Sequence, residues 1–235
     1  MIRFILTDIE GTTTSIHFVH KVLFPYAKEH LREFVEVHNA DAEVKACIDE
    51  TTQTIFDETH IWADQEKCIA ILEKWIDDDR KHLALKTLQG HIWREGYETG
   101  KFTGHIYEDV PDILKEWKNA GLDLGVYSSG SVEAQQLLFR HSDFGDLTSY
   151  FTAFFDTQVG QKRESDSYKY ITSQLPFLAD EILFLSDIEE ELDAAKIAGM
   201  QTIQLVRDHA NPSSRHETAV NFVSVNEQIA ELNKA

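Results

Sequence analysis

Positive charge is scarce in this sequence. It has 22 lysines and arginines against 41 aspartates and glutamates, which gives a formal net charge of −19. A field of that sign repels nucleic-acid backbones and anionic membrane surfaces, so we predict no nucleic-acid partner and no membrane partner. An anionic small molecule is repelled in the same way. A phosphate site in this chain therefore needs a local cation, either a basic side chain or a metal ion.

Cysteine and long apolar runs are equally rare. The two cysteines, Cys47 and Cys68, form neither a disulfide framework nor a Cys-x-x-Cys metal pair, which is typical of a reducing compartment. The apolar run at residues 2–6 ends before Asp8 and is too short for a signal-peptide core. No later segment has the ~20 apolar residues of a membrane-spanning helix. We expect a cytoplasmic protein, and without long heptads we expect a monomer.

Strand and helix patterns alternate along most of the chain. Apolar runs predict strands at residues 3–7, 123–127, 151–155, 182–186 and 201–206, and amphipathic patterns predict helices at 110–120, 132–140, 168–175 and 190–198. Alternation at this spacing is typical of a parallel sheet with helices on both faces. The predicted fold class is α/β, with a Rossmann-like doubly wound parallel sheet.

Residues 17–98 interrupt this alternation. The segment is rich in charge and shows helical stripes but no strand pattern, and Asp41 and Asp64 stand at positions typical of helix N-caps. About four helices fit into it, which favours a small bundle. We predict a core domain formed by residues 1–16 and 99–235, with an inserted helical bundle at 17–98.

Polar residues follow four of the predicted strands. In parallel α/β sheets ligands bind beyond the carboxyl ends of the strands, so these residues are expected to converge on one edge. They are Asp8 and Glu10 after the first strand, Ser128 and Ser129 after the second, Lys162 after the third, and Asp187 after the fourth.

These residue types suit phosphoryl transfer. The carboxylate of Asp8 can act as the nucleophile, and Asp8 and Asp187 supply the oxygen ligands that Mg²⁺ prefers. Ser128 can donate to a phosphate oxygen, and Lys162 places a positive charge beside the transferring group. Glu10 is suited to protonate the leaving oxygen and then to activate water. We therefore predict a magnesium-dependent phosphatase.

Each of these residues also has a structural explanation when taken alone. An aspartate after a strand is often a turn residue, Ser-Ser-Gly often begins a helix, and acidic residues such as those at 189–191 are typical of an exposed first helical turn. Their joint occurrence in one order carries the prediction. The sequence contains no P-loop, Gly-x-Gly-x-x-Gly, His-Glu-x-x-His or Gly-x-Ser-x-Gly motif, and its 11 histidines show no metal-binding spacing.

The four positions resemble the motifs of the haloacid dehalogenase superfamily. Asp8-x-Glu-Gly-Thr, Ser128, Lys162 and Asp187 match them in order, with Glu10 where the common first motif has a second aspartate. Longer segments are similar to the enolase-phosphatase (acireductone synthase) family. They are Asp8–Thr14, Leu88–Trp93, Tyr127–Gln135 and Leu137–Phe139, and the resemblance is densest over residues 82–199.

The resemblance implies a bifunctional enzyme of methionine salvage. Such an enzyme enolises 2,3-diketo-5-methylthiopentyl-1-phosphate and then hydrolyses the phosphate to the acireductone, using Mg²⁺. It implies that the helical insert is a cap over the substrate. The implied metal ligands are Asp8, Glu10 and Asp187, the implied substrate-binding residues are Ser128, Ser129 and Lys162, and the implied catalytic residues are Asp8, Glu10 and Lys162.

Several alternatives stay open. Glu10 is our hypothesis for the base in enolisation, and His17, His20 and His91 are minor candidates. The same motifs are compatible with a generic small-molecule phosphomonoesterase, or with a non-catalytic module that only binds Mg²⁺. The residues that recognise the methylthio end and the rate-limiting step do not follow from the sequence.

Overall fold

The computed structural model describes residues 1–207, 211–213 and 215–233. The chain divides into two units: unit 1 comprises Met1–Ile16 and Thr103–Ala235, and unit 2 comprises His17–Phe102. Among the described residues, no helix combines the length and the apolar character needed to cross a bilayer.

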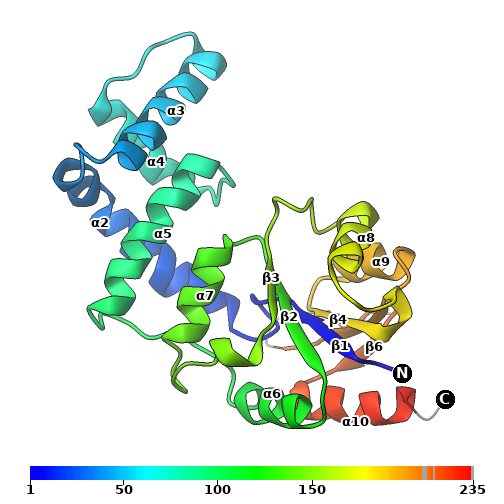
Figure 1. Ribbon diagram of the computed structural model, residues 1–235. Coiled ribbons are helices and arrows are strands. Elements are labelled where there is room, and N and C mark those ends of the chain that lie inside the picture. Colours follow the sequence, from blue (N-terminus) through cyan, green and yellow to red (C-terminus); the bar gives the residue numbers. More distant parts are fainter. Residues whose placement is uncertain (208–210, 214, 234–235) are drawn as a thin grey trace. The chain divides into compact units, whose positions relative to one another are not determined.

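Unit 1 is built on a sheet of six parallel strands (Figure 1). They are β1 (Phe4–Thr7), β2 (Asp123–Tyr127), β3 (Ala153–Phe155), β4 (Ile182–Ser186), β5 (Gln201–Leu205) and β6 (Glu217–Ala219). Their order in the sheet is β3-β2-β1-β4-β5-β6. The predicted Rossmann-like doubly wound sheet is confirmed.

Helices cover both faces of this sheet, which explains the strand sequences. They are α6 (Val110–Asn119), α7 (Val132–Arg140), α8 (Ser165–Gln174), α9 (Glu189–Ile197) and α10 (Phe222–Leu232). Helices α6 and α10 lie on one face and α8 and α9 on the other (Figure 1). The central strands β1 and β4 are buried along their whole length, so they are nearly continuous apolar runs rather than alternating ones.

Some elements of unit 1 differ from the sequence prediction. Strand β3 begins at Ala153, because residues 148–150 form a 3₁₀ turn and Phe151 packs on Phe139 with ring centroids 4.5 Å apart. Helix α8 begins at Ser165, three residues before the predicted start. Strand β6 and helix α10 were not predicted, and the three residues of β6 are too few to show a periodic pattern.

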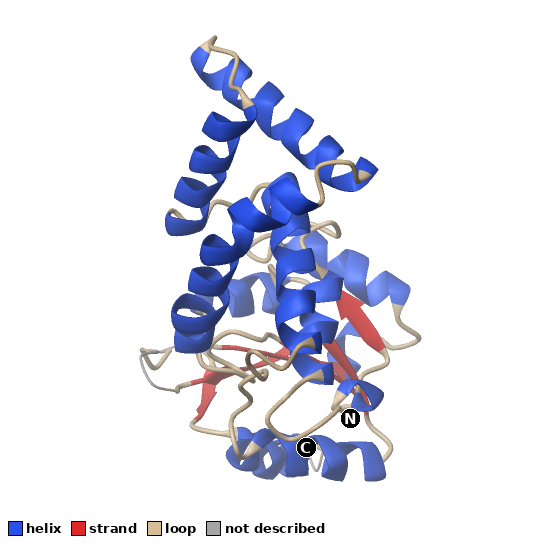
Figure 2. Ribbon diagram, turned by 90° about the vertical axis from the view of Figure 1, so that its left-hand side faces the viewer, coloured by secondary structure: helices blue, strands red, loops and turns tan. Residues whose placement is uncertain are grey.

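Unit 2 contains helices and no strand (Figure 2). They are α1 (Ile16–Phe18, which starts in unit 1), the π-helical turn η1 (Val19–Leu23), α2 (Phe24–Val37), α3 (Ala42–Thr59), α4 (Gln65–Asp77) and α5 (Leu83–Glu98). Asp41 accepts a hydrogen bond from the amide of Glu43, and Asp64 from that of Lys67, so both predicted N-caps are confirmed. An apolar core that includes Leu72 joins the long helices.

The helical unit continues a few residues beyond α5. Phe102 packs against Phe18, Tyr26 and Tyr97, with ring centroids 4.6 to 6.5 Å apart. These three rings belong to unit 2, so residues 99–102 group with the helices rather than with the sheet. The prediction placed the boundary at the end of the helix pattern, at residue 98.

Candidate active site

The register of the sheet brings the strand ends of unit 1 together. Thr7 pairs with Val126 on one side and with Leu185 on the other. Asp8 therefore follows β1 at the level where β2 and β4 also end, and its amide donates to the carbonyl of Leu185 at 2.9 Å. The order of strands reverses at β1 and β4, which is where ligands bind in doubly wound sheets.

Residues 8–14, which we call the Asp8 loop, form a tight turn after β1. The amides of residues 12, 13 and 14 all donate to the carbonyl of Ile9, at 2.9 to 3.1 Å. Gly11 has a φ of +76°, and a Cβ at this position would lie 2.3 Å from Oδ2 of Asp187. Only glycine fits here, because both the backbone conformation and the neighbouring carboxylate exclude a side chain.

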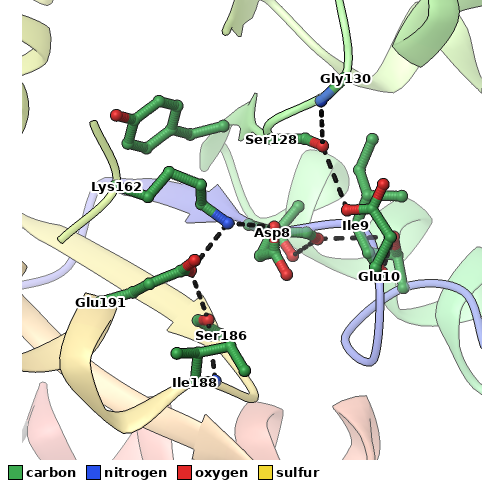
Figure 3. A network of polar contacts seen from close by, with 12 residues as sticks. Asp8, Ile9, Glu10, Ser128, Gly130, Lys162, Ser186, Ile188 and Glu191 are labelled. Carbon is green, nitrogen blue, oxygen red and sulfur yellow. Dashed lines mark hydrogen bonds and ion pairs between the residues drawn. The ribbon is translucent and has the colours of Figure 1, made fainter. Parts of the chain in front are cut away.

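Lys162 lies between two buried carboxylates (Figure 3). Its Nζ contacts Oδ1 of Asp8, and Oε2 of Glu191 at 2.7 Å. Burial by itself lowers the pKa of Lys162, but the charges of Asp8 and Glu191 outweigh burial and raise this pKa above its usual value. Lys162 is therefore an ammonium group that supplies positive charge, and it is unsuited to act as a base.

Acidic groups outnumber basic ones around Asp8. Three further carboxylates, of Glu10, Asp187 and Glu191, act on Asp8, together with the one ammonium group of Lys162. Burial, and then the three carboxylates, raise the pKa of Asp8 against the effect of Lys162. Burial and the charge of Glu191 raise the pKa of Asp187 to about 6. This surplus of negative charge favours the binding of a further cation.

The residues present fit a magnesium ion. Oδ1 of Asp187 is buried and has no hydrogen-bond partner among the described residues. The same part of the chain contains no cluster of three His, Cys, Asp or Glu side chains with metal-binding geometry. Mg²⁺ does not need such a cluster, because it is commonly held by one or two carboxylates, water and the substrate phosphate. Asp8 and Asp187 supply those two carboxylates.

Ser128 connects the end of β2 to the Asp8 loop. Its hydroxyl donates to Oε2 of Glu10 at 3.1 Å and accepts a hydrogen bond from the amide of Gly130 at 3.1 Å (Figure 3). Ser129 is half-buried in the same turn. The structure thus brings Glu10 and Ser128 into direct contact, so the position of the Glu10 carboxylate is set by the strand beside it.

Glu191 is the main site residue that the sequence did not single out. It is buried, and besides Lys162 it contacts the hydroxyl of Ser186, which donates to Oε2 at 2.8 Å. The Ser186 hydroxyl in turn accepts from the amide of Ile188 at 3.1 Å. In the sequence Glu191 belongs to an acidic helix start, and the one available signal was its place four residues after Asp187.

Two tyrosines hold the segment that carries Lys162. The hydroxyl of Tyr168 donates to the carbonyl of Lys162 at 2.7 Å, and the hydroxyl of Tyr127 donates to the carbonyl of Gly160 at 2.9 Å. Both side chains are fully buried. They fix the backbone on both sides of residue 161, so the ammonium group approaches Asp8 from a fixed direction.

The minor proton-transfer candidates lie in unit 2. His91 pairs with Glu43 at 3.0 Å, and His20 packs edge-on against Phe24 with ring centroids 5.4 Å apart. His17 is exposed. His20 and His91 therefore contact side chains of the helical unit itself.

Comparisons with known proteins agree with this geometry. Residues 2–199 match the haloacid dehalogenase-like hydrolase family. The chain is 54% identical to enolase-phosphatase E1 of Serratia proteamaculans over 94% of this chain and 96% of that one. It is 48% identical to enolase-phosphatase E1 of Erwinia tasmaniensis over 97% and 99%.

Solved structures show the same fold. The Unknown transcript 4 protein of Saccharomyces cerevisiae matches with a TM-score of 0.77 and 33% identity, over 95% of this chain and all of that one. CbbY of Rhodobacter sphaeroides, solved in complex with phosphate, matches with a TM-score of 0.59 and 19% identity over 96% of each chain. The chain belongs to the haloacid dehalogenase-like hydrolases and, within them, to the enolase-phosphatase family. It is a phosphatase enzyme.

Proposed function

We propose that this protein enolises 2,3-diketo-5-methylthiopentyl-1-phosphate and then hydrolyses the phosphate, giving the acireductone 1,2-dihydroxy-3-keto-5-methylthiopentene of methionine salvage. The observation that carries the proposal is the buried contact of Lys162 with both Asp8 and Glu191, in a chain about half identical to named enolase-phosphatases. The reaction uses Asp8 as nucleophile at a site that otherwise has an excess of negative charge.

In the phosphatase half-reaction, a carboxylate oxygen of Asp8 attacks phosphorus and the bond from phosphorus to the C1 oxygen breaks. Glu10 donates a proton to that departing oxygen. Glu10 then takes a proton from water, whose oxygen attacks phosphorus and releases inorganic phosphate and free Asp8. Lys162 offsets charge on the transferring group, and Ser128 and Ser129 orient its oxygens.

Asp8, Asp187 and the main-chain carbonyl of Glu10 would hold Mg²⁺, which supplies charge neutralisation between the carboxylate and the phosphate. The buried and unpartnered Oδ1 of Asp187 supports this assignment. The surplus of carboxylates over ammonium groups around Asp8 supports it as well.

In the enolisation half-reaction, a carbon-bound proton next to a carbonyl is removed and the electron pair moves onto the carbonyl oxygen, which takes up a proton from solvent to give the enol. We assign the proton abstraction to Glu10, because Ser128 donates to Oε2 of Glu10 at 3.1 Å and leaves its other oxygen available. Lys162 stabilises the developing negative charge, since it remains protonated between two carboxylates. The cytoplasmic location, the monomeric state and the role of the helical unit as a cap stay predictions.

The test is an anaerobic time course with the diketone phosphate and Mg²⁺, which follows enol absorbance and free phosphate in one sample. Wild type is compared with Asp8→Asn and Glu10→Gln. We expect wild type to form the enol first and phosphate second. Asp8→Asn should stop at the phosphorylated enol, with phosphate release reduced at least ~1,000-fold.

Two outcomes would contradict the proposal. Phosphate release without enolisation would leave a generic phosphomonoesterase, the second candidate from the sequence. Full enolisation by Glu10→Gln would remove Glu10 as the base. Sustained turnover of any phosphomonoester by the wild type is expected of an enolase-phosphatase and of a generic phosphomonoesterase, but not of a module that only binds Mg²⁺.

A further inference from the structure

The carbonyl of Thr12, in the Asp8 loop, is held by Arg207, which follows β5. Nε of Arg207 donates to this carbonyl at 2.8 Å. The other two guanidinium nitrogens donate to the two carboxylate oxygens of Asp109, at 2.9 and 2.8 Å. The side chain of Arg207 is 7% exposed. A guanidinium can bind a carboxylate with two nitrogens and still donate sideways from Nε, which an ammonium group cannot do.

The partners of Arg207 are themselves fixed. Oδ2 of Asp109 also accepts a hydrogen bond from the amide of Phe222, at 2.7 Å, at the start of α10. The guanidinium stacks on the ring of Tyr107 at 4.0 Å, and the amide of Tyr107 donates to the carbonyl of Thr13 at 3.0 Å. The segment that resumes unit 1 after the helical insert therefore holds two successive carbonyls of the Asp8 loop, that of Thr13 directly through Tyr107 and that of Thr12 through Arg207 and Asp109.

This anchor acts on the part of the loop that touches Asp187. Gly11 precedes Thr12, and the 2.3 Å separation between a Cβ at Gly11 and Oδ2 of Asp187 shows that loop and carboxylate are in direct contact. Arg207, Gly11 and Asp187 line one pocket of about 370 Å³. A displacement of the Asp8 loop at Thr12 would shift the neighbouring Gly11 against Asp187, and would so change the separation between Asp8 and Asp187.

We propose that Arg207 is a positioning residue for phosphoryl transfer: it fixes the Asp8 loop against Asp187, and so sets the spacing of the two carboxylates that would bind Mg²⁺. The proposal rests on the phosphatase function proposed above. In this proposal Arg207 does not contact the reacting atoms. Its effect passes through the Thr12 carbonyl, and Asp109 supports it by holding the guanidinium in place.

The test compares Arg207→Lys, Arg207→Met and Asp109→Asn with the wild type. Arg3→Met is a control for the loss of an arginine at a more exposed site, because Arg3 also pairs with a carboxylate, of Glu181, and lies over the ring of Phe177, but at the opposite end of β1. Three quantities are measured well below each melting temperature: Mg²⁺ affinity by calorimetry without substrate, kcat and KM.

We expect Arg207→Lys and Arg207→Met to weaken Mg²⁺ binding and to lower kcat by about 10- to 100-fold, because small displacements of reacting groups have effects of that size. Substrate KM measured at saturating Mg²⁺ should change less than kcat. Asp109→Asn should give a smaller loss in the same direction, and Arg3→Met should leave all three quantities unchanged.

The inference is overturned if Arg207→Lys keeps the wild-type Mg²⁺ affinity and kcat while only its melting temperature falls, since that is the result of a purely structural ion pair. If neither Arg207 variant folds, Asp109→Asn decides by the same criterion. Calorimetry needs no substrate, so a wild type that binds Mg²⁺ but does not turn over the diketone phosphate would contradict the proposed function and leave this inference standing.

Discussion

The two units of this protein differ in whether they bury charged side chains. Unit 1 buries Asp8, Lys162 and Glu191 in mutual contact. In unit 2 the ion pairs lie on the surface, as in the pair of Arg32 with Glu66, and none of its Asp, Glu, Lys or Arg residues is buried. Taking charged groups out of water is costly even when they are paired, because the desolvation penalty can exceed the attraction between them, so unit 1 carries an energetic penalty that unit 2 avoids. The difference indicates where the chain has been shaped for chemistry rather than for stability.

The largest stability effect is expected from the apolar core of unit 2. Leu72 is fully buried among the long helices, so Leu72→Ala leaves a cavity and should lower the free energy of unfolding of unit 2 by about 2.7–5 kcal/mol. Hydrogen exchange followed by mass spectrometry on peptides from residues 65–98 measures this loss locally. Because the proposed metal ligands all lie in unit 1, calorimetric Mg²⁺ affinity should stay at the wild-type value, and a large drop in that affinity would contradict the separation of roles.

A smaller effect on stability, joined to a loss of activity, is expected from the buried charges. Glu191→Gln keeps a side chain of the same shape but removes a charge from Lys162, which should lower the free energy of unfolding by roughly 1.5–3 kcal/mol. It should also reduce kcat, since Lys162 is then held by Asp8 alone. Glu66→Gln is the matched control in unit 2, where loss of the exposed pair with Arg32 should leave stability almost unchanged, because solvent screens exposed pairs.

Urea unfolding and steady-state kinetics on these two variants decide the comparison. Equal stability losses for Glu191→Gln and Glu66→Gln would mean that the buried contact with Lys162 does not differ energetically from a surface pair. A stability loss for Glu191→Gln without a change in kcat would make Glu191 a structural residue only.

The sequence was sufficient for the parts of the fold that depend on continuous local patterns. Strands β1 and β4 are unbroken apolar runs, and the rule that ligands bind at strand ends then led to Asp8 and Asp187. Glu191 and Arg207 could not be found in this way. An acid in a first helical turn is usually exposed, and its burial here depends on Lys162 arriving from a distant loop.

Dependence on contacts between distant segments also explains the features that the sequence patterns did not predict. Strand β6 has three residues and is recognisable only by its pairing with β5, because residues 203–205 align with residues 217–219. The end of unit 2 depends on where the ring of Phe102 packs, and not on where the helical pattern stops. Contacts between segments far apart in the chain decide such features, and a local pattern does not contain them.

The smallest expected effect is a pH dependence of unit 2, which rests on His82. Its Nε2 lies 3.0 Å from the hydroxyl of Thr54 and its ring packs on Trp75 with centroids 4.7 Å apart. Burial is the main cause that lowers the pKa of His82 from its usual 6.5. The unfolded chain therefore takes up a proton at a higher pH than the folded chain does. Stability is fully present above pH 6.5 and is lost as the pH falls from there toward the lower pKa of the folded state.

Urea unfolding of unit 2 between roughly pH 7.5 and pH 5.5, the window in which an ordinary histidine titrates, measures this loss. His82→Gln should reduce the slope of stability against pH, because it removes the titrating group. His60→Asn is the matched control: His60 is exposed and has a φ of 58°, a conformation that asparagine tolerates, so this variant should keep the wild-type slope. A slope that is unchanged in His82→Gln would show that the pH dependence of the helical unit comes from its surface charges. The two units would then differ only in the buried carboxylates of unit 1.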